Sequence, residues 1–133
     1  MLTLRPEPVG SRPCLVLAHA DEAYALRACG SFRRLGWDVH FADNGVEARG
    51  LARTLSPNLV ILDTQLPDES GWLTCDKLTR EMPRLKVLLL GMHPRSRNQN
   101  FAAFVGATAL VDRLDGLLGI LHEFADQAIP VIR

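Results

Sequence analysis

The regular alternation of short apolar runs with longer stretches of helical periodicity constrains the fold of this chain more than any other feature of its sequence. Five runs of mostly apolar residues are separated by stretches in which apolar side chains recur at every third or fourth position. Parallel strands need a crossover between them, usually a helix, so this alternation is typical of repeated strand–helix units. We expect strands at residues 14–18, 37–41, 59–62, 86–90 and 107–111.

Helix start and stop signals lie between these runs. Asp21 or Glu22 begins the first predicted helix, Gly36 ends it, and Ser70 is a suitable N-cap for the third. A fourth helix leads into residues 101–105. The apolar stripe of the second helix, expected to face the core, is placed at Val46, Ala48, Leu51, Ala52 and Leu55, and that of a last helix at Leu114, Leu117, Leu118, Leu121 and Phe124 or Ala125. Because such crossovers are right-handed, the helices cover both faces of the sheet, which predicts a doubly wound α/β three-layer sandwich.

Composition limits the size and the class of the protein. A chain of 133 residues fits one domain, which we place at residues 14–128, with a flexible Pro-interrupted tail at 1–13 and a short tail at 129–133. Fifteen basic and fifteen acidic residues give a net charge of zero, which disfavours direct binding to nucleic acid or to an anionic membrane. No apolar run approaches the roughly 18 residues of a membrane span. Three cysteines without metal-type spacing predict neither disulfides nor a zinc site, so we expect a cytoplasmic protein.

The carboxyl ends of the predicted strands should form the functional edge of the sheet, because ligands of such folds bind there. This edge would bring together residues 18–21, 63–65, 91–93 and 112–114. Asp63 closes the most apolar strand, and its carboxylate either caps the following loop, pairs with Arg113 or takes part in chemistry. His19 and His93 flank the same position, so a Zn²⁺ site is a further interpretation beside the simpler one of two solvated imidazoles.

Several segments at these places resemble one known family. They are Gly36, "DNGVEA" from residue 43, "LVILDTQLP" from residue 59 followed by Gly71, and "GATALV" from residue 106. Together they resemble the receiver domain of two-component response regulators, a CheY-like, flavodoxin-like fold, over about residues 14–128. The resemblance implies the strand order 2-1-3-4-5 and the transfer of a phosphoryl group from a partner histidine kinase to Asp63.

The resemblance also implies a set of residues around Asp63, from which this chain departs. Family members hold Mg²⁺ with an acidic pair after the first strand, with the acceptor aspartate and with the backbone carbonyl two residues beyond it, here that of Gln65. The acidic pair falls on His19 and Ala20, so Mg²⁺ binding is disfavoured unless Asp21 substitutes through a reshaped loop. The family's hydroxyl, lysine and aromatic-switch positions fall on Gly91, Arg113 and Leu110.

These departures favour an atypical receiver without enzymatic activity, signalling through protein contacts with weak or absent phosphorylation of Asp63. An ordinary single-domain regulator phosphorylated on Asp63 by a histidine kinase is the alternative. A small enzyme or cofactor binder of the same fold is a remote one, since no Gly-rich phosphate loop follows the first strand. The expected partner is a histidine kinase or another signalling protein, and no organic cofactor is expected. A partner face or homodimer contact on the fourth helix, fifth strand and last helix would include Phe101, Phe104, Leu110 and Leu114.

Overall fold

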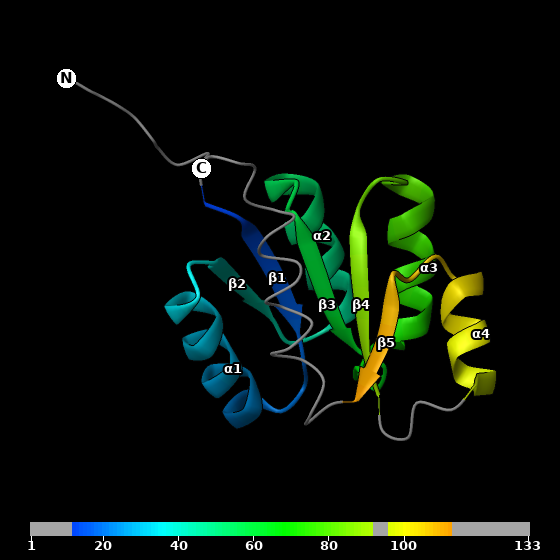
Figure 1. The fold of residues 1–133 in the computed structure, drawn as a ribbon, viewed down its shortest axis with the longest axis horizontal. Helices are drawn as coiled ribbons and strands as arrows, with labels where there is room; N and C mark the ends of the chain where they lie inside the picture. The colour runs from blue at the N-terminus through cyan, green and yellow to red at the C-terminus, as the bar shows by residue number, and fades with distance from the viewer. Residues whose placement is uncertain (1–11, 92–95, 113–133) are drawn as a thin grey trace.

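The computed structural model of the chain describes residues 12–91 and 96–112. Strands and helices alternate along it (Figure 1), as β1 (Cys14–Ala18), α1 (Glu22–Arg34), β2 (Asp38–Ala42), α2 (Gly45–Leu55), β3 (Leu59–Asp63), α3 (Gly71–Glu81), β4 (Lys86–Gly91), α4 (Ser96–Phe104) and β5 (Ala109–Asp112). Every predicted strand is present, and the predicted last helix lies outside the described residues. Of the helices described, none has the length and apolar character that crossing a membrane requires.

The strands form one parallel sheet in the order β2-β1-β3-β4-β5, which Figure 1 shows from left to right. This confirms the predicted order. β3 lies between β1 and β4, and all of its residues are buried. A strand covered on both faces needs apolar side chains on both, which explains why its sequence is continuously apolar up to Asp63. The carboxyl ends of all the strands consequently meet at one edge of the sheet.

Side chains of the strands alternate between two faces and build two separate cores. One core joins Leu15 and Ile61 to Phe32 of α1. The other joins Val16 and Val60 to the buried faces of α2, α3 and α4. The sheet is therefore the middle layer, with α1 on one side and α2, α3 and α4 on the other, as the predicted sandwich requires.

Two strands begin later than predicted, and in each case the backbone of the first residues is used elsewhere. The Ala107 N–H donates to the Ala102 carbonyl at 2.9 Å and closes the end of α4, so β5 begins only at Ala109. The Trp37 N–H likewise donates to the Phe32 carbonyl at 3.1 Å and closes the end of α1. β2 therefore begins at residue 38.

Two further expectations need correction. Val46 is 55% exposed and does not belong to the buried stripe of α2, because its position in the first turn faces away from the sheet that Ala48 and Ala52 contact. Pro13 was expected in the flexible tail. Its carbonyl accepts from the Asp38 N–H at 2.8 Å, so the packed structure includes it.

Candidate functional site

Asp63 is the last residue of β3 and lies at the carboxyl edge of the sheet, toward which the strand arrowheads point in Figure 1. The sheet holds its backbone firmly, since the following Thr64 N–H still donates to the Leu90 carbonyl at 2.9 Å. Asp63 is only 2% exposed. A carboxylate withdrawn from water to this extent needs donors or positive charge close by, so its neighbours decide its chemistry.

His19, in the loop after β1, lies directly against this carboxylate. Its Nε2 is 3.0 Å from Asp63 Oδ2, and both side chains are buried. The approach is within ion-pair distance without being an aligned hydrogen bond, because Nε2 makes no hydrogen bond within the part of the chain described. The short distance is what matters for the electrostatics: the loop presents an imidazole to Asp63 at the place where the resemblance implies a carboxylate.

Two further contacts fix the ring of His19. Nδ1 accepts from the Asp21 N–H at 2.9 Å, and the ring stacks on Tyr24 with 4.4 Å between the ring centroids. Because Nδ1 acts as the acceptor, the proton of the neutral imidazole is assigned to Nε2, the atom that faces Asp63. The sequence placed His19 at this edge, but it gave no signal for the stacking of Tyr24.

The other oxygen of Asp63 and the neighbouring acidic residue are also engaged. Asp63 Oδ1 accepts from the Gln65 N–H at 2.7 Å. Asp21 Oδ1 accepts from the Tyr24 N–H at 3.1 Å, because Asp21 is the N-cap of α1.

Mg²⁺ requires an octahedral shell of oxygen ligands. The two acidic-pair positions offer an imidazole and the methyl group of Ala20, so these residues do not fit that ion.

The loop between β3 and α3 is anchored on the first turn of α2. The Asp68 carboxylate accepts from the Gly45 and Val46 N–H groups at 2.8 and 2.9 Å. Desolvation acts to raise the pKa of Asp68, but these amide donors outweigh it and lower the pKa to about 2. This role of Asp68 was not predicted, because the helix start that it caps lies 23 residues away along the chain and no local pattern links the two.

Glu69 provides a second anchor for the same loop. Its carboxylate lies 3.0 Å from Arg49 Nε of α2 and 3.1 Å from Lys77 Nζ of α3, and it accepts from the Thr74 hydroxyl at 2.8 Å. Burial acts to raise the pKa of Glu69, and these three donors together lower it. The segment after Asp63 is thus tied to two helices.

The hydroxyl position of the family carries no side chain here. Gly91 ends β4, and a Cβ added to it would lie 3.3 Å from Leu110 Cδ1 and 3.8 Å from the side chain of Thr64. A small residue such as Ser would therefore fit after a shift of a few tenths of an ångström. Arg113, His93 and Leu114 lie outside the described residues. The Asp63–Arg113 ion pair and the His19–His93 zinc site consequently stay predictions.

The predicted partner face is only partly exposed. Leu110 is 4% exposed and packs in the core, so it cannot contribute to an exposed contact. Phe101 and Phe104 of α4 are 46% and 77% exposed, with 6.2 Å between their ring centroids. Phe101 also lies 5.0 Å from Trp72 of α3. The exposed aromatic surface is therefore formed by α3 and α4, and we call Trp72, Phe101 and Phe104 the aromatic face.

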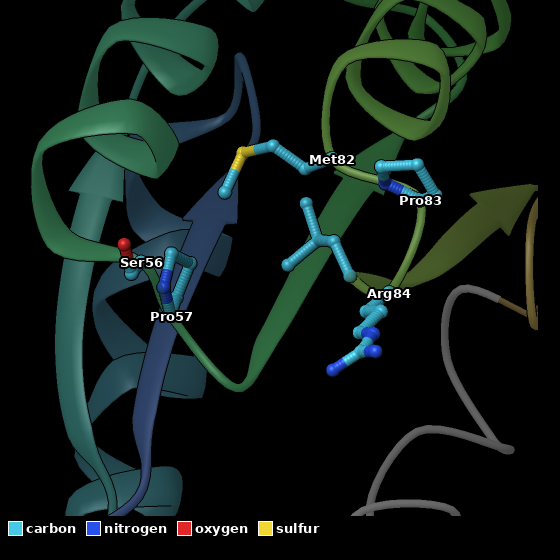
Figure 2. A pocket seen from close by; sticks show the side chains of 6 residues that line it. Ser56, Pro57, Met82, Pro83 and Arg84 are labelled. Atoms are coloured by element: carbon cyan, nitrogen blue, oxygen red, sulfur yellow. The ribbon is translucent and has the colours of Figure 1, made fainter.

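A hollow of about 410 Å³ lies at the opposite edge of the sheet (Figure 2). Its walls come from the turns that precede β3 and β4, namely Ser56, Pro57, Met82, Pro83, Arg84 and Leu85. The side chain of Met82 extends toward Ser56 and Pro57 in Figure 2. The hollow borders the amino ends of the strands, so it does not belong to the site around Asp63.

Comparison with known proteins agrees with this arrangement. The response regulator receiver domain family matches residues 16–113. The probable transcriptional regulatory protein TcrX of Mycobacterium tuberculosis is 40% identical over 80 residues, which cover 59% of this chain and 34% of TcrX. The polar-differentiation response regulator DivK of Brucella anthropi is 33% identical over 86 residues, covering 59% of this chain and 70% of DivK. The chain thus spans about a third of the length of TcrX and more of DivK.

Solved structures share the fold at low sequence identity. The chemotaxis protein CheY4 of Vibrio cholerae superimposes with a TM-score of 0.78 at 17% identity, covering 85% of this chain and 98% of CheY4. A CheY-like response regulator receiver domain protein of Methanospirillum hungatei gives a TM-score of 0.75 at 22% identity, covering 88% of this chain and 97% of that protein. At such identities these similarities concern the fold alone.

Proposed function

The chain belongs to the response regulator receiver domain family, and we propose that it is an atypical member that signals through protein contacts, with phosphorylation of Asp63 weak or absent. Two-component signal transduction is the setting, since its relatives include response regulators such as DivK. Members of this family act in general as signalling modules rather than as enzymes.

The observation that carries the proposal is the 3.0 Å approach of His19 Nε2 to Asp63 Oδ2. Transfer of a phosphoryl group to an aspartate builds negative charge on the transferred oxygens, which a divalent cation normally offsets. Receiver domains in general bind Mg²⁺ at an acidic site. Here an imidazole ring takes the place of the first carboxylate, with its Nε2 at 3.0 Å from Asp63 Oδ2. It supplies no negative charge to hold a cation.

The accessibility of Asp63 supports the same proposal. The Asp63 residue is 2% exposed, with Oδ2 facing His19 and Oδ1 accepting from the Gln65 N–H. An acceptor oxygen must reach the phosphorus atom in line with the leaving group. The ring of His19, held by Asp21 and stacked on Tyr24, would have to move first.

If Asp63 is not phosphorylated, a signal has to pass through contacts with other proteins. Large aromatic side chains gathered on a surface mark interaction sites more often than ordinary surface does. The aromatic face of α3 and α4 has this character, and we place on it the contact with a histidine kinase, another signalling protein or a second copy of this chain.

Phosphorylation can be tested by restoring the missing carboxylates. We expect wild-type protein incubated with Mg²⁺ and acetyl phosphate to gain little phosphate by intact mass. The double variant His19→Asp/Ala20→Asp should bind Mg²⁺ in calorimetry and become labelled, because two carboxylates and Asp63 then surround the cation. Adding Gly91→Ser should increase the label further.

The matched control is the restored variant that also carries Asp63→Asn, which should lose the label. Strong labelling of the wild type that Asp63→Asn abolishes would refute the proposal. The protein would then be an ordinary phospho-accepting regulator.

A further inference from the structure

Three side chains of different ligand types meet at the amino ends of β1 and β2, on the opposite edge of the sheet from Asp63. The Cys14 sulfur, an Asp38 carboxylate oxygen and a His40 ring nitrogen all lie within 4.8 Å of one another. The strand register pairs Cys14 with Asp38 and Val16 with His40. Residues two apart on a strand point to the same face, so the register itself brings the three together.

The distances suit a small tetrahedral cation. Zinc binds imidazole nitrogen and carboxylate oxygen at about 2.0–2.2 Å, so two such ligands in a tetrahedron lie about 3.3 Å apart. His40 Nε2 and Asp38 Oδ2 are 3.2 Å apart. The Asp38 side chain is 51% exposed and that of His40 is 35% exposed, so both can rotate slightly to bring the sulfur within range.

The backbone under these ligands is already fixed. The Cys14 N–H donates to Asn58 Oδ1 at 2.7 Å, and the Asp38 N–H donates to the Pro13 carbonyl at 2.8 Å. Ligands carried by paired strands need little ordering when a cation binds, which favours affinity. The exposure of Asp38 also leaves a fourth coordination position open to water.

Charge balance supports the same ligand set. A thiolate and a carboxylate together carry the two negative charges that a divalent cation neutralises, while the imidazole binds as a neutral ligand. The soft thiolate, together with imidazole, selects zinc-like ions over Mg²⁺ or Ca²⁺.

We propose that Cys14, Asp38 and His40 form a binding site for one Zn²⁺ ion, with three protein ligands and an open fourth position. The proposal differs from the expectation, based on cysteine spacing, that the chain has no zinc site. Its ligands are far apart along the chain, and only the pairing of β1 with β2 unites them. The bound ion would link the edge strand β2 to β1.

Co²⁺ provides a spectroscopic test, because a cobalt–thiolate bond gives a charge-transfer absorption that nitrogen and oxygen ligands do not. The 133-residue chain under a phosphine reductant should bind one Co²⁺ with that band, and Zn²⁺ should displace it. Cys14→Ser should abolish the band, and His40→Ala should weaken the affinity by at least about tenfold, the loss typical even of an outer-shell partner. Cys29→Ala, which removes a buried thiol outside the cluster, is the control and should bind as the wild type does.

A second measurement uses the unmodified chain and does not depend on how well a variant folds. Zn²⁺ should slow the alkylation of Cys14, measured by peptide mass, and leave Cys29 and Cys75 unchanged. Binding without a thiolate band, equal affinity in Cys14→Ser, or alkylation of Cys14 at the same rate with and without Zn²⁺ would each overturn the proposal.

Discussion

Asp63 is a buried carboxylate whose neighbours are a ring nitrogen and a backbone amide, at 3.0 and 2.7 Å. At the residue scale, His19 places an imidazole beside Asp63 where the resemblance implies a carboxylate, so this position brings no negative charge for a cation. The position of His19 could be read from the sequence. The orientation of its ring could not be predicted. It is set by the hydrogen bond from the Asp21 N–H and by the stacking on Tyr24, and both contacts form only in the folded loop.

Asp68 gives a prediction about pH. Asp68→Asn keeps one acceptor oxygen but loses the charge and the second acceptor, so it should lower the free energy of unfolding at neutral pH by about 1 kcal/mol at this exposed site. The pKa of Asp68 is about 2 in the folded protein against an ordinary 3.8. A depressed pKa stabilises the fold above the ordinary value, and that contribution is lost as the pH falls toward 2. The difference between wild type and variant should therefore shrink below about pH 4.

Urea unfolding between about pH 6 and about pH 3 measures this difference. Asp43→Asn is the control, since the Asp43 carboxylate accepts from the Asn44 side chain rather than from the α2 amides. A loss of stability in Asp68→Asn that stays constant over this range would contradict the charge-dependent anchor.

At the scale of the elements, the strands were predictable because each is a buried apolar run, and β1 was placed to the residue. Several strand ends differ by one residue, and the starts that were predicted wrongly are those of β2 and β5, where backbone N–H groups close the preceding helix instead of joining the sheet. The spacing of apolar residues does not indicate whether a backbone N–H will close the preceding helix or join the sheet. The anchoring of the β3–α3 loop on α2 was missed for a similar reason, since Asp68 and Glu69 find their partners across the fold.

Gly71 gives a prediction about how α3 approaches β3. A Cβ at this position would collide with the Asp63 carbonyl oxygen and lie 2.8 Å from its carbon and 2.9 Å from Thr64 Cα. Because these are backbone atoms that cannot swing aside, Gly71→Ala should destabilise the fold by about 1–3 kcal/mol. Gly50→Ala in α2 is the matched control. A Cβ added at Gly50 would meet no atom within 4 Å, so this substitution should stabilise the fold by about 0.5–1 kcal/mol.

Thermal or urea unfolding should show that Gly71→Ala is less stable than the wild type and that Gly50→Ala is more stable. If Gly71→Ala were as stable as the wild type, the close packing of α3 on the end of β3 would not constrain the position of Asp63.

At the scale of the whole molecule, the sheet separates two edges with different chemistry. The carboxyl edge carries Asp63 and His19, and the amino edge carries Cys14, Asp38 and His40. The strand order came from the family resemblance, because periodicity predicts strands without arranging them. The cluster of Cys14, Asp38 and His40 was not predicted, because it depends on the register between β1 and β2, which no local pattern specifies.

The aromatic face gives a prediction about assembly. Phe104→Asp should leave the stability within about 0.5 kcal/mol of the wild type, because the side chain is 77% exposed. It should reduce self-association, since a charge in the middle of an apolar contact must lose its water. Light scattering across a range of protein concentrations should show the apparent mass rising for the wild type and constant for the variant.

Leu26→Asp is the matched control, because Leu26 is 62% exposed on α1, the helix that covers the other side of the sheet. Equal self-association in all three proteins would remove the aromatic face as the contact between copies.

The contact between His19 and Asp63 has a consequence for how such a protein carries information. On the proposed function, Asp63 carries no phosphoryl group, so an upstream kinase would not change the state of this protein. The strength of the signal would then be set by the number of copies in the cell. Transcription and proteolysis would be the input, and a response would last as long as the polypeptide itself.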